Sequence, residues 1–89
     1  MQIKKGFRLR TVGRENIVTG EGLEQVDFNK LISLNDSAAY LWKEVEGKQF
    51  DEEVLASLLV EKYEISEEQA REDATDVIKS WLDVGIIEM

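Results

Sequence analysis

The side chains of this chain that could carry out chemistry are almost all carboxylates. The sequence contains 19 Asp and Glu residues but no His and no Cys. A chain without imidazole or thiol groups lacks the usual general base, the thiol nucleophile and the common ligands of zinc and haem. Catalysis or metal binding would therefore have to depend on grouped carboxylates.

Two groups of carboxylates stand out, Asp51-Glu52-Glu53 and Glu67-Glu68. Each begins a segment whose apolar residues have helical spacing, and the helix dipole stabilises negative charge in the first turn of a helix. Neither group has the ligand spacing of a calcium-binding loop. We therefore predict a chain that is not an enzyme and that binds no metal and no other cofactor.

Length and composition predict one globular domain over residues 1–89. The chain is 43% apolar and 34% charged, which is typical of folded domains and not of disordered ones. A chain of this length buries roughly 60–65% of its unfolded surface, enough for one core but not for a deep cleft. No stretch approaches the roughly 18 apolar residues of a membrane-spanning helix, and no secretion signal is evident, so we expect a cytoplasmic location.

The charge of the chain is unevenly distributed along its length. Its net charge is −8, yet five basic residues precede the first acid, Glu15: Lys4, Lys5, Arg8, Arg10 and Arg14. The acidic remainder repels nucleic acids and anionic lipids, because binding to them relies on Lys and Arg contacts to phosphate. A basic or apolar partner suits this surface better.

Three short strands are expected in the first part of the chain. Residues 7–12 alternate between apolar and polar types until the last two positions, Thr11 and Val12, and residues 17–19 form a β-branched run. Residues 13–16 have the composition of a turn, so the two runs predict a hairpin. Residues 31–34 form a third strand whose polar neighbours limit its length, and we place it at an edge of the sheet.

Three helices are expected in the second part, each with a start signal. Asn35, Asp51 and Ser66 are predicted N-caps, and Gln69 completes a capping box with Ser66. The first helix ends near Gly47 and the second near Tyr63. The third spans about 18 residues up to Gly85, which suits a left-handed helix end. Ile86 and Ile87 are expected to form a final extended segment.

Apolar residues at helical spacing indicate which helix faces are buried. The predicted stripe of the second helix consists of Val54, Leu55, Leu58 and Leu59, and that of the third consists of Ala70, Ala74, Val77, Ile78 and Trp81. Trp42 and Trp81 are in phase with these stripes. We favour core packing for both Trp residues and also for Tyr40 and Tyr63, although Trp81 could form the floor of a groove.

Strands grouped before helices predict an α+β fold, a winged helix-turn-helix-like domain in which a three-stranded antiparallel sheet is followed by three helices. Such a fold raises the possibility of DNA binding by the third helix. That helix, however, carries six acids against only Arg71 and Lys79. Carboxylates in a major groove oppose binding, so we do not favour a DNA-binding role.

The short third strand is open to two interpretations. An unpaired strand edge can accept another strand, and an adjoining helix can then supply side-chain pockets for a peptide. The same edge could equally be a simple surface kept soluble by its charges. The residues alone favour neither alternative over the other.

Residues 34–42 have the sequence Leu-Asn-Asp-Ser-Ala-Ala-Tyr-Leu-Trp. They precede a predicted helix with an acidic N-cap and then a predicted helix that contains residues 77–82. This order of elements resembles the PqqD-like proteins, and the similarity extends from Phe7 to Ile87. Their fold is the recognition element that binds the leader segments of ribosomally made, later modified peptides. Members serving pyrroloquinoline quinone synthesis usually have a proline-containing segment after the second strand. Here Gly20-Glu21-Gly22 stands instead, so we expect a PqqD-like relative with another peptide substrate.

The resemblance implies that a leader peptide is added as a strand between the third strand and the third helix and is delivered to a modifying enzyme, typically a radical S-adenosylmethionine enzyme. Carried onto this chain, the implied peptide-binding residues are Lys30, Leu31, Ile32, Ser33, Leu34, Asp73, Asp76, Val77, Ser80 and Trp81. The acids on this rim would suit a leader with Lys or Arg beside apolar anchors. A winged-helix DNA binder, a homodimerisation module and a module that only docks an enzyme are the alternatives.

Overall fold

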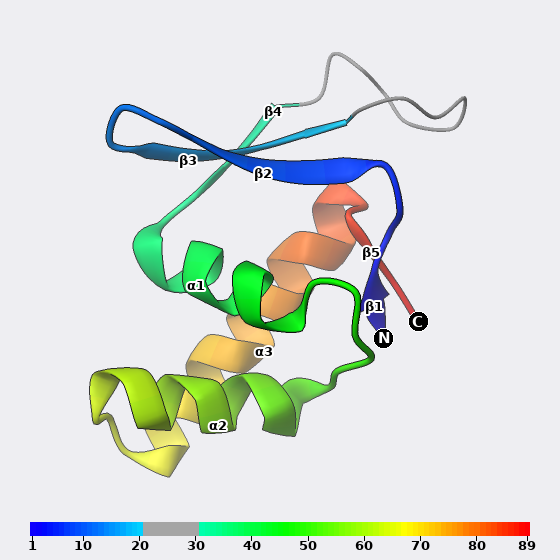
Figure 1. Cartoon of the computed structure of the whole chain (residues 1–89). Coiled ribbons are helices and arrows are strands. Elements are labelled where there is room, and N and C mark those ends of the chain that lie inside the picture. The colour runs from blue at the N-terminus through cyan, green and yellow to red at the C-terminus, as the bar shows by residue number, and fades with distance from the viewer. Residues whose placement is uncertain (21–30) are drawn as a thin grey trace.

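The protein has an α+β fold in which a sheet lies across three helices, as predicted (Figure 1). The computed structural model describes residues 1–20 and 31–89. The antiparallel sheet contains, in spatial order, β2 (Phe7–Val12), β3 (Glu15–Gly20) and β4 (Leu31–Leu34). The helices that follow are α1 (Asp36–Val45), α2 (Glu52–Tyr63) and α3 (Glu67–Val84).

The first two strands form a tight hairpin, which confirms the predicted connection. Val12 pairs with Glu15, so Gly13 and Arg14 alone make the turn. Gly13 has a φ of 64°, a left-handed conformation that glycine adopts without strain. Because the turn is this short, β3 begins at Glu15, earlier than the predicted run of residues 17–19.

A second, two-stranded sheet was not predicted. The strands β1 (Gln2–Ile3) and β5 (Ile87–Glu88) pair antiparallel, and the Lys4 amide donates to the Ile86 carbonyl at 2.9 Å. The sequence indicates an extended segment at Ile86 and Ile87, and both side chains are buried. Strands of two residues are too short for side-chain alternation to reveal them, so the pairing partner was missed.

The predicted N-caps are confirmed at all three helices. The side chains of Asn35, Asp51 and Ser66 accept hydrogen bonds from the third following amide, at 2.8, 2.9 and 3.1 Å. Only half of the predicted capping box forms, because the Gln69 side-chain amide donates to Asp73 at 2.9 Å and the Gln69 side chain accepts no hydrogen bond from the Ser66 backbone amide. Helix α3 is 18 residues long and ends at Gly85, whose φ is 78°.

The core lies where the helices meet the sheet. Trp42 and Trp81 are 0% and 1% exposed, which confirms the prediction of core packing. Their rings meet edge to face with centroids 5.7 Å apart, and Phe50 meets Trp81 at 6.2 Å. The prediction of core packing was wrong for Tyr63, which is 40% exposed because it is the last residue of α2. Its ring packs edge to face on the partly buried Tyr40 at 6.2 Å.

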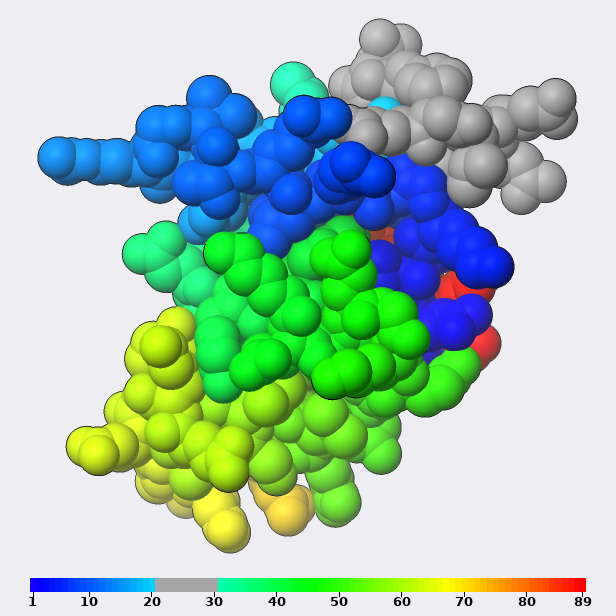
Figure 2. Space-filling model, in the orientation of Figure 1, coloured from blue at the N-terminus to red at the C-terminus, as the bar shows by residue number. Residues whose placement is uncertain are grey.

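The buried side of α2 differs from the predicted stripe. Leu55, Ala56 and Leu59 are buried, whereas Val54 is 41% exposed. The prediction was wrong for Val54 because α2 turns its Ala56 side toward α3, which rotates Val54 outward. On the face shown in Figure 2, α1 and α2 cover most of α3.

Candidate functional site

Strand β4 lies at an edge of the sheet, as predicted. It pairs with β3 through four cross-strand positions, from Asn16 opposite Leu34 to Thr19 opposite Leu31. Within residues 1–20 and 31–89, no strand pairs with its other side. The amide and carbonyl groups on that side are available to hydrogen-bond an additional strand.

The side chains of β4 alternate between the two faces of the sheet. Ile32 is half-buried and lies opposite the fully buried Val18, and Leu34 is 8% exposed, so both face the helices. Leu31 and Ser33 face outward, and Leu31 is 70% exposed. An added strand would follow the same alternation, because residues directly opposite each other share a face.

Helix α3 presents a partly exposed stripe beside its core-facing residues. Each helical residue advances the side chain by about 100°, so Asp73, Val77, Ser80 and Val84 fall on one line. Ser80 is exposed and the other three are half-buried, and both valines pack against the core. We call these four residues the open flank. Val84 was missed by the sequence analysis, although its spacing of two turns from Val77 could have identified it.

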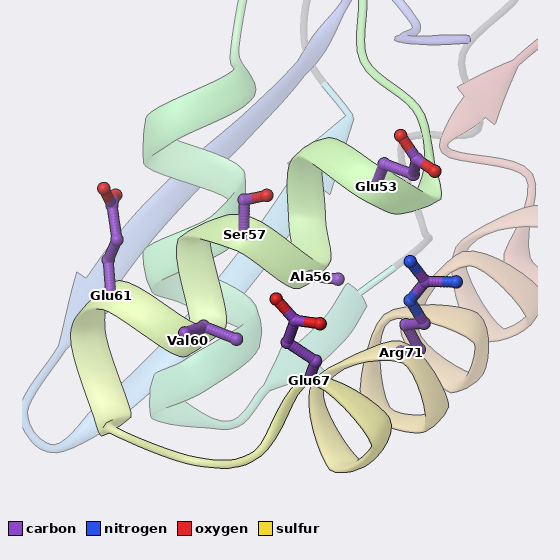
Figure 3. A pocket seen from close by; sticks show the side chains of 7 residues that line it. All are labelled: Glu53, Ala56, Ser57, Val60, Glu61, Glu67 and Arg71. Atoms are coloured by element: carbon purple, nitrogen blue, oxygen red, sulfur yellow. The ribbon is translucent and has the colours of Figure 1, made fainter.

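The other side of α3 borders a cavity that the sequence did not indicate (Figure 3). Its volume is about 340 Å³, and Ala56, Ser57 and Val60 of α2 line it. Glu67 and Arg71 contribute from α3, and we call these two residues the cavity flank. In Figure 3 the Arg71 side chain extends from α3 toward the first turn of α2, where Glu53 lies. Charged groups therefore dominate the rim of this cavity.

The predicted site residues fall into three environments. Ile32, Leu34, Val77 and Trp81 all belong to the core or pack against it. Leu31, Ser33, Asp76 and Ser80 are exposed, and Asp73 is half-buried. Trp81 contributes to the interior beneath the site, because its 1% exposure leaves almost no surface for a ligand. Lys30 lies outside the described residues.

Residues 1–20 and 31–89 contain neither grouped metal ligands nor a membrane-spanning helix. In these ranges no three or more His, Cys, Asp or Glu side chains are grouped so that they could hold a metal ion. None of the helices there combines the length and the apolar character needed to cross a membrane.

Comparison with known proteins places the chain in a family. The family model described as Coenzyme PQQ synthesis protein D (PqqD) matches residues 16–87, which include β4 and the whole of α3. The chain belongs to the PqqD family. No curated protein matches it.

A solved structure shares the fold of this PqqD-family chain. It is described as "TbiB1 in Complex with the TbiA(beta) Leader Peptide", and the two chains superpose with a TM-score of 0.75 at 16% sequence identity. The similarity covers 99% of this chain and 95% of the other. The arrangement of the sheet and the three helices is therefore common to both proteins.

Proposed function

We propose that this PqqD-family domain is a non-catalytic adaptor that captures the leader of a ribosomally made precursor peptide. The leader is added as a strand to the free edge of β4 and lies against the open flank of α3. The observation that carries the proposal is the unpaired side of β4 among the described residues, beside Ile32 and Leu34 that already face the helices. Main-chain groups then supply affinity, and side-chain contacts supply selectivity.

The peptide bound in the solved structure supports the proposal that this domain binds a leader peptide. The solved structure of TbiB1 contains the TbiA(beta) leader peptide, and this chain has the same fold over nearly its full length. The two chains are only 16% identical. We therefore carry over to this chain the binding of a leader peptide, and not the identity of the leader.

The expected energetics permit capture but favour a tethered ligand. About four main-chain hydrogen bonds contribute about 4 kcal/mol, and two apolar anchors contribute about 4 kcal/mol more. A binding free energy of about 8 kcal/mol corresponds to micromolar affinity. The cost of association must still be subtracted, so the net affinity is weaker. A second partner that holds the peptide would raise its effective concentration.

That second partner is an enzyme that modifies the precursor peptide. The domain contributes no catalytic group, and it presents the leader so that the remainder of the peptide reaches the enzyme. A radical S-adenosylmethionine enzyme is the class that the family resemblance suggests. Binding of the enzyme to a domain already loaded with leader would be tighter than to the empty domain, because the two associations are linked.

A scan of N-methylated peptides tests strand addition. In a strand added at an edge, alternate peptide amides point toward β4, so N-methylation there removes a hydrogen bond and introduces a clash. We expect alternate positions of a candidate leader to lose at least about tenfold in affinity, about 1.4 kcal/mol, while the intervening positions stay unchanged. Equal tolerance at all positions in isothermal titration calorimetry would contradict the proposal.

A further inference from the structure

The charges around β4 indicate which peptides the edge would select. The carbonyl of Leu34 and the carboxylate of Asp36 are held together, because the Asn16 side-chain amide donates to both, at 3.4 and 3.0 Å. Asp36 is exposed at the start of α1. A carboxylate is therefore fixed beside the end of β4 that leads into α1.

Helix α3 adds two more carboxylates on the same side of the molecule as its open flank. Asp73 belongs to that flank, and Asp76 lies one turn before Ser80 and is exposed. Asp73 accepts a hydrogen bond from Gln69, which holds its side chain on the helix surface. In Figure 1 α3 descends away from the sheet past α1 toward its N-terminus. Asp73 and Asp76 lie near the middle of this helix, farther than Ser80 and Val84 from its C-terminal end.

Positive charge is missing from the same surfaces. The open flank contains no Lys or Arg, and Arg71 extends instead into the cavity beside α2. The first two turns of α1 likewise contain no basic residue, since Lys43 belongs to the last turn. Among the described residues, a peptide lying along β4 and the open flank would therefore meet carboxylates but no basic side chain, and Lys30 before β4 lies outside these residues.

We propose that the captured segment is a cationic strand, an inference that rests on the proposed strand capture at β4. Two apolar side chains of the peptide, at alternate positions, face the helices on the same side as Ile32 and Leu34. They approach Val77 and Val84 of the open flank. Lys or Arg residues follow at the end of the strand next to Leu34, where Asp36, Asp73 and Asp76 attract them. An acidic leader with the same apolar pattern is rejected by like-charge repulsion.

The test uses two synthetic peptides and three forms of the protein. Both peptides contain two valines at alternate positions, and one carries a pair of lysines at each end where the other carries glutamates. The proteins are the wild type, the double variant Asp73→Lys/Asp76→Lys, and the control Glu61→Lys/Glu68→Lys. The control changes two exposed acids away from the open flank, Glu61 on the rim of the α2–α3 cavity and Glu68 in the first turn of α3, and alters the net charge equally.

We expect the wild type and the control to bind the lysine peptide at least about fivefold more tightly than the glutamate peptide at low salt. The Asp73→Lys/Asp76→Lys variant should reverse that order, and the differences should fall below about twofold near 1 M salt. Circular dichroism would check that all three proteins are folded. Fluorescence anisotropy of labelled peptides gives the affinities, and amide shifts of residues 31–34 report where the peptides bind.

The outcomes separate this inference from the proposed function. Shifts at residues 31–34 with equal affinity for both peptides would overturn the cationic preference and leave strand capture standing. A reversal of preference in the Glu61→Lys/Glu68→Lys control would also overturn it, because net charge alone would then explain the selectivity. If neither peptide perturbs residues 31–34 at saturating concentration, strand capture itself is contradicted.

Discussion

The two flanks of α3 are built from one helix but meet different neighbours. The cavity flank, Glu67 and Arg71, is closed over by α2, and charged side chains from both helices surround the cavity of about 340 Å³. The open flank, Asp73, Val77, Ser80 and Val84, contains an exposed serine and keeps two half-buried valines at the surface. One side of α3 therefore packs against α2, whereas the other leaves apolar surface partly exposed.

For the proposed peptide capture, the apolar surface of the open flank should matter more than the α2–α3 cavity. Filling a cavity rimmed by Glu53, Glu61, Glu67 and Arg71 would remove solvent from charged groups, which costs more than a small ligand returns. Covering aliphatic surface beside unpaired main-chain groups with a peptide is favourable, because apolar surface is buried and main-chain hydrogen bonds form. Binding should therefore respond to changes on the open flank and not to matched changes on the cavity flank.

Trp81 lies between the flanks and should give the largest effect on stability. Replacing it with Ala removes a side chain that is 1% exposed and two edge-to-face contacts, with Trp42 and Phe50. We expect a loss of about 3–5 kcal/mol in the free energy of unfolding, measured by urea denaturation. Both flanks would be disordered together.

The matched control is the neighbouring Leu82, which is 42% exposed. Leu82→Ala should cost less than about 1 kcal/mol. A Trp81→Ala protein within about 1 kcal/mol of the wild type would contradict the central position assigned to this side chain. Trp81→Phe provides an intermediate variant if the Ala protein does not fold, and its loss should lie between the other two.

A bulky residue on the open flank can be compared with one on the side of α3 that continues from Arg71. Ser80→Trp places an indole on the open flank, and Thr75→Trp places one about 140° around the helix, one turn beyond Arg71. Both positions are exposed, so both variants should fold. We expect Ser80→Trp to weaken binding of a leader peptide at least about tenfold, about 1.4 kcal/mol, and Thr75→Trp to change it less than about twofold.

Fluorescence anisotropy with a labelled leader peptide measures both affinities. Equal losses in the two variants would remove the distinction between the flanks. Tighter binding to Ser80→Trp alone would mean that the indole extends the apolar surface, so the peptide would still be assigned to the open flank.

Arg71 should give the smallest effect. Arg71→Ala removes the cation that α3 contributes to the cavity but leaves β4 and the open flank intact. Peptide affinity should stay within about twofold of the wild type, because a surface substitution away from the binding site seldom exceeds about 0.5 kcal/mol. A tenfold loss in the same titration would move the site to the α2–α3 cavity.

Much of this architecture follows from local signals in the sequence. Asn35, Asp51 and Ser66 mark the helix starts because a polar side chain there satisfies a free amide, and Gly85 marks an end because it tolerates positive φ. The edge position of β4 was predicted from its short length. The family resemblance was confirmed by a match over residues 16–87.

What the sequence could not indicate depends on distant contacts. The pairing of β1 with β5 joins residues about 85 positions apart, from Ile3 opposite Ile87 to Gln2 opposite Glu88, and two-residue strands carry no periodic signal. The exposure of Val54 depends on which side of α2 meets α3. Whether Trp81 forms a groove floor or the interior depends on where Trp42 and Phe50 pack.

The most direct test of peptide capture at β4 is hydrogen exchange of backbone amides with and without a leader peptide, followed by NMR. Addition of a strand should slow the exchange of outward-pointing amides in residues 31–34 and shift the amides of residues 77–84, while residues 53–61 beside the cavity stay unchanged. If protection appears at residues 53–61 and residues 31–34 exchange as in the free protein, the peptide does not bind at the edge of β4.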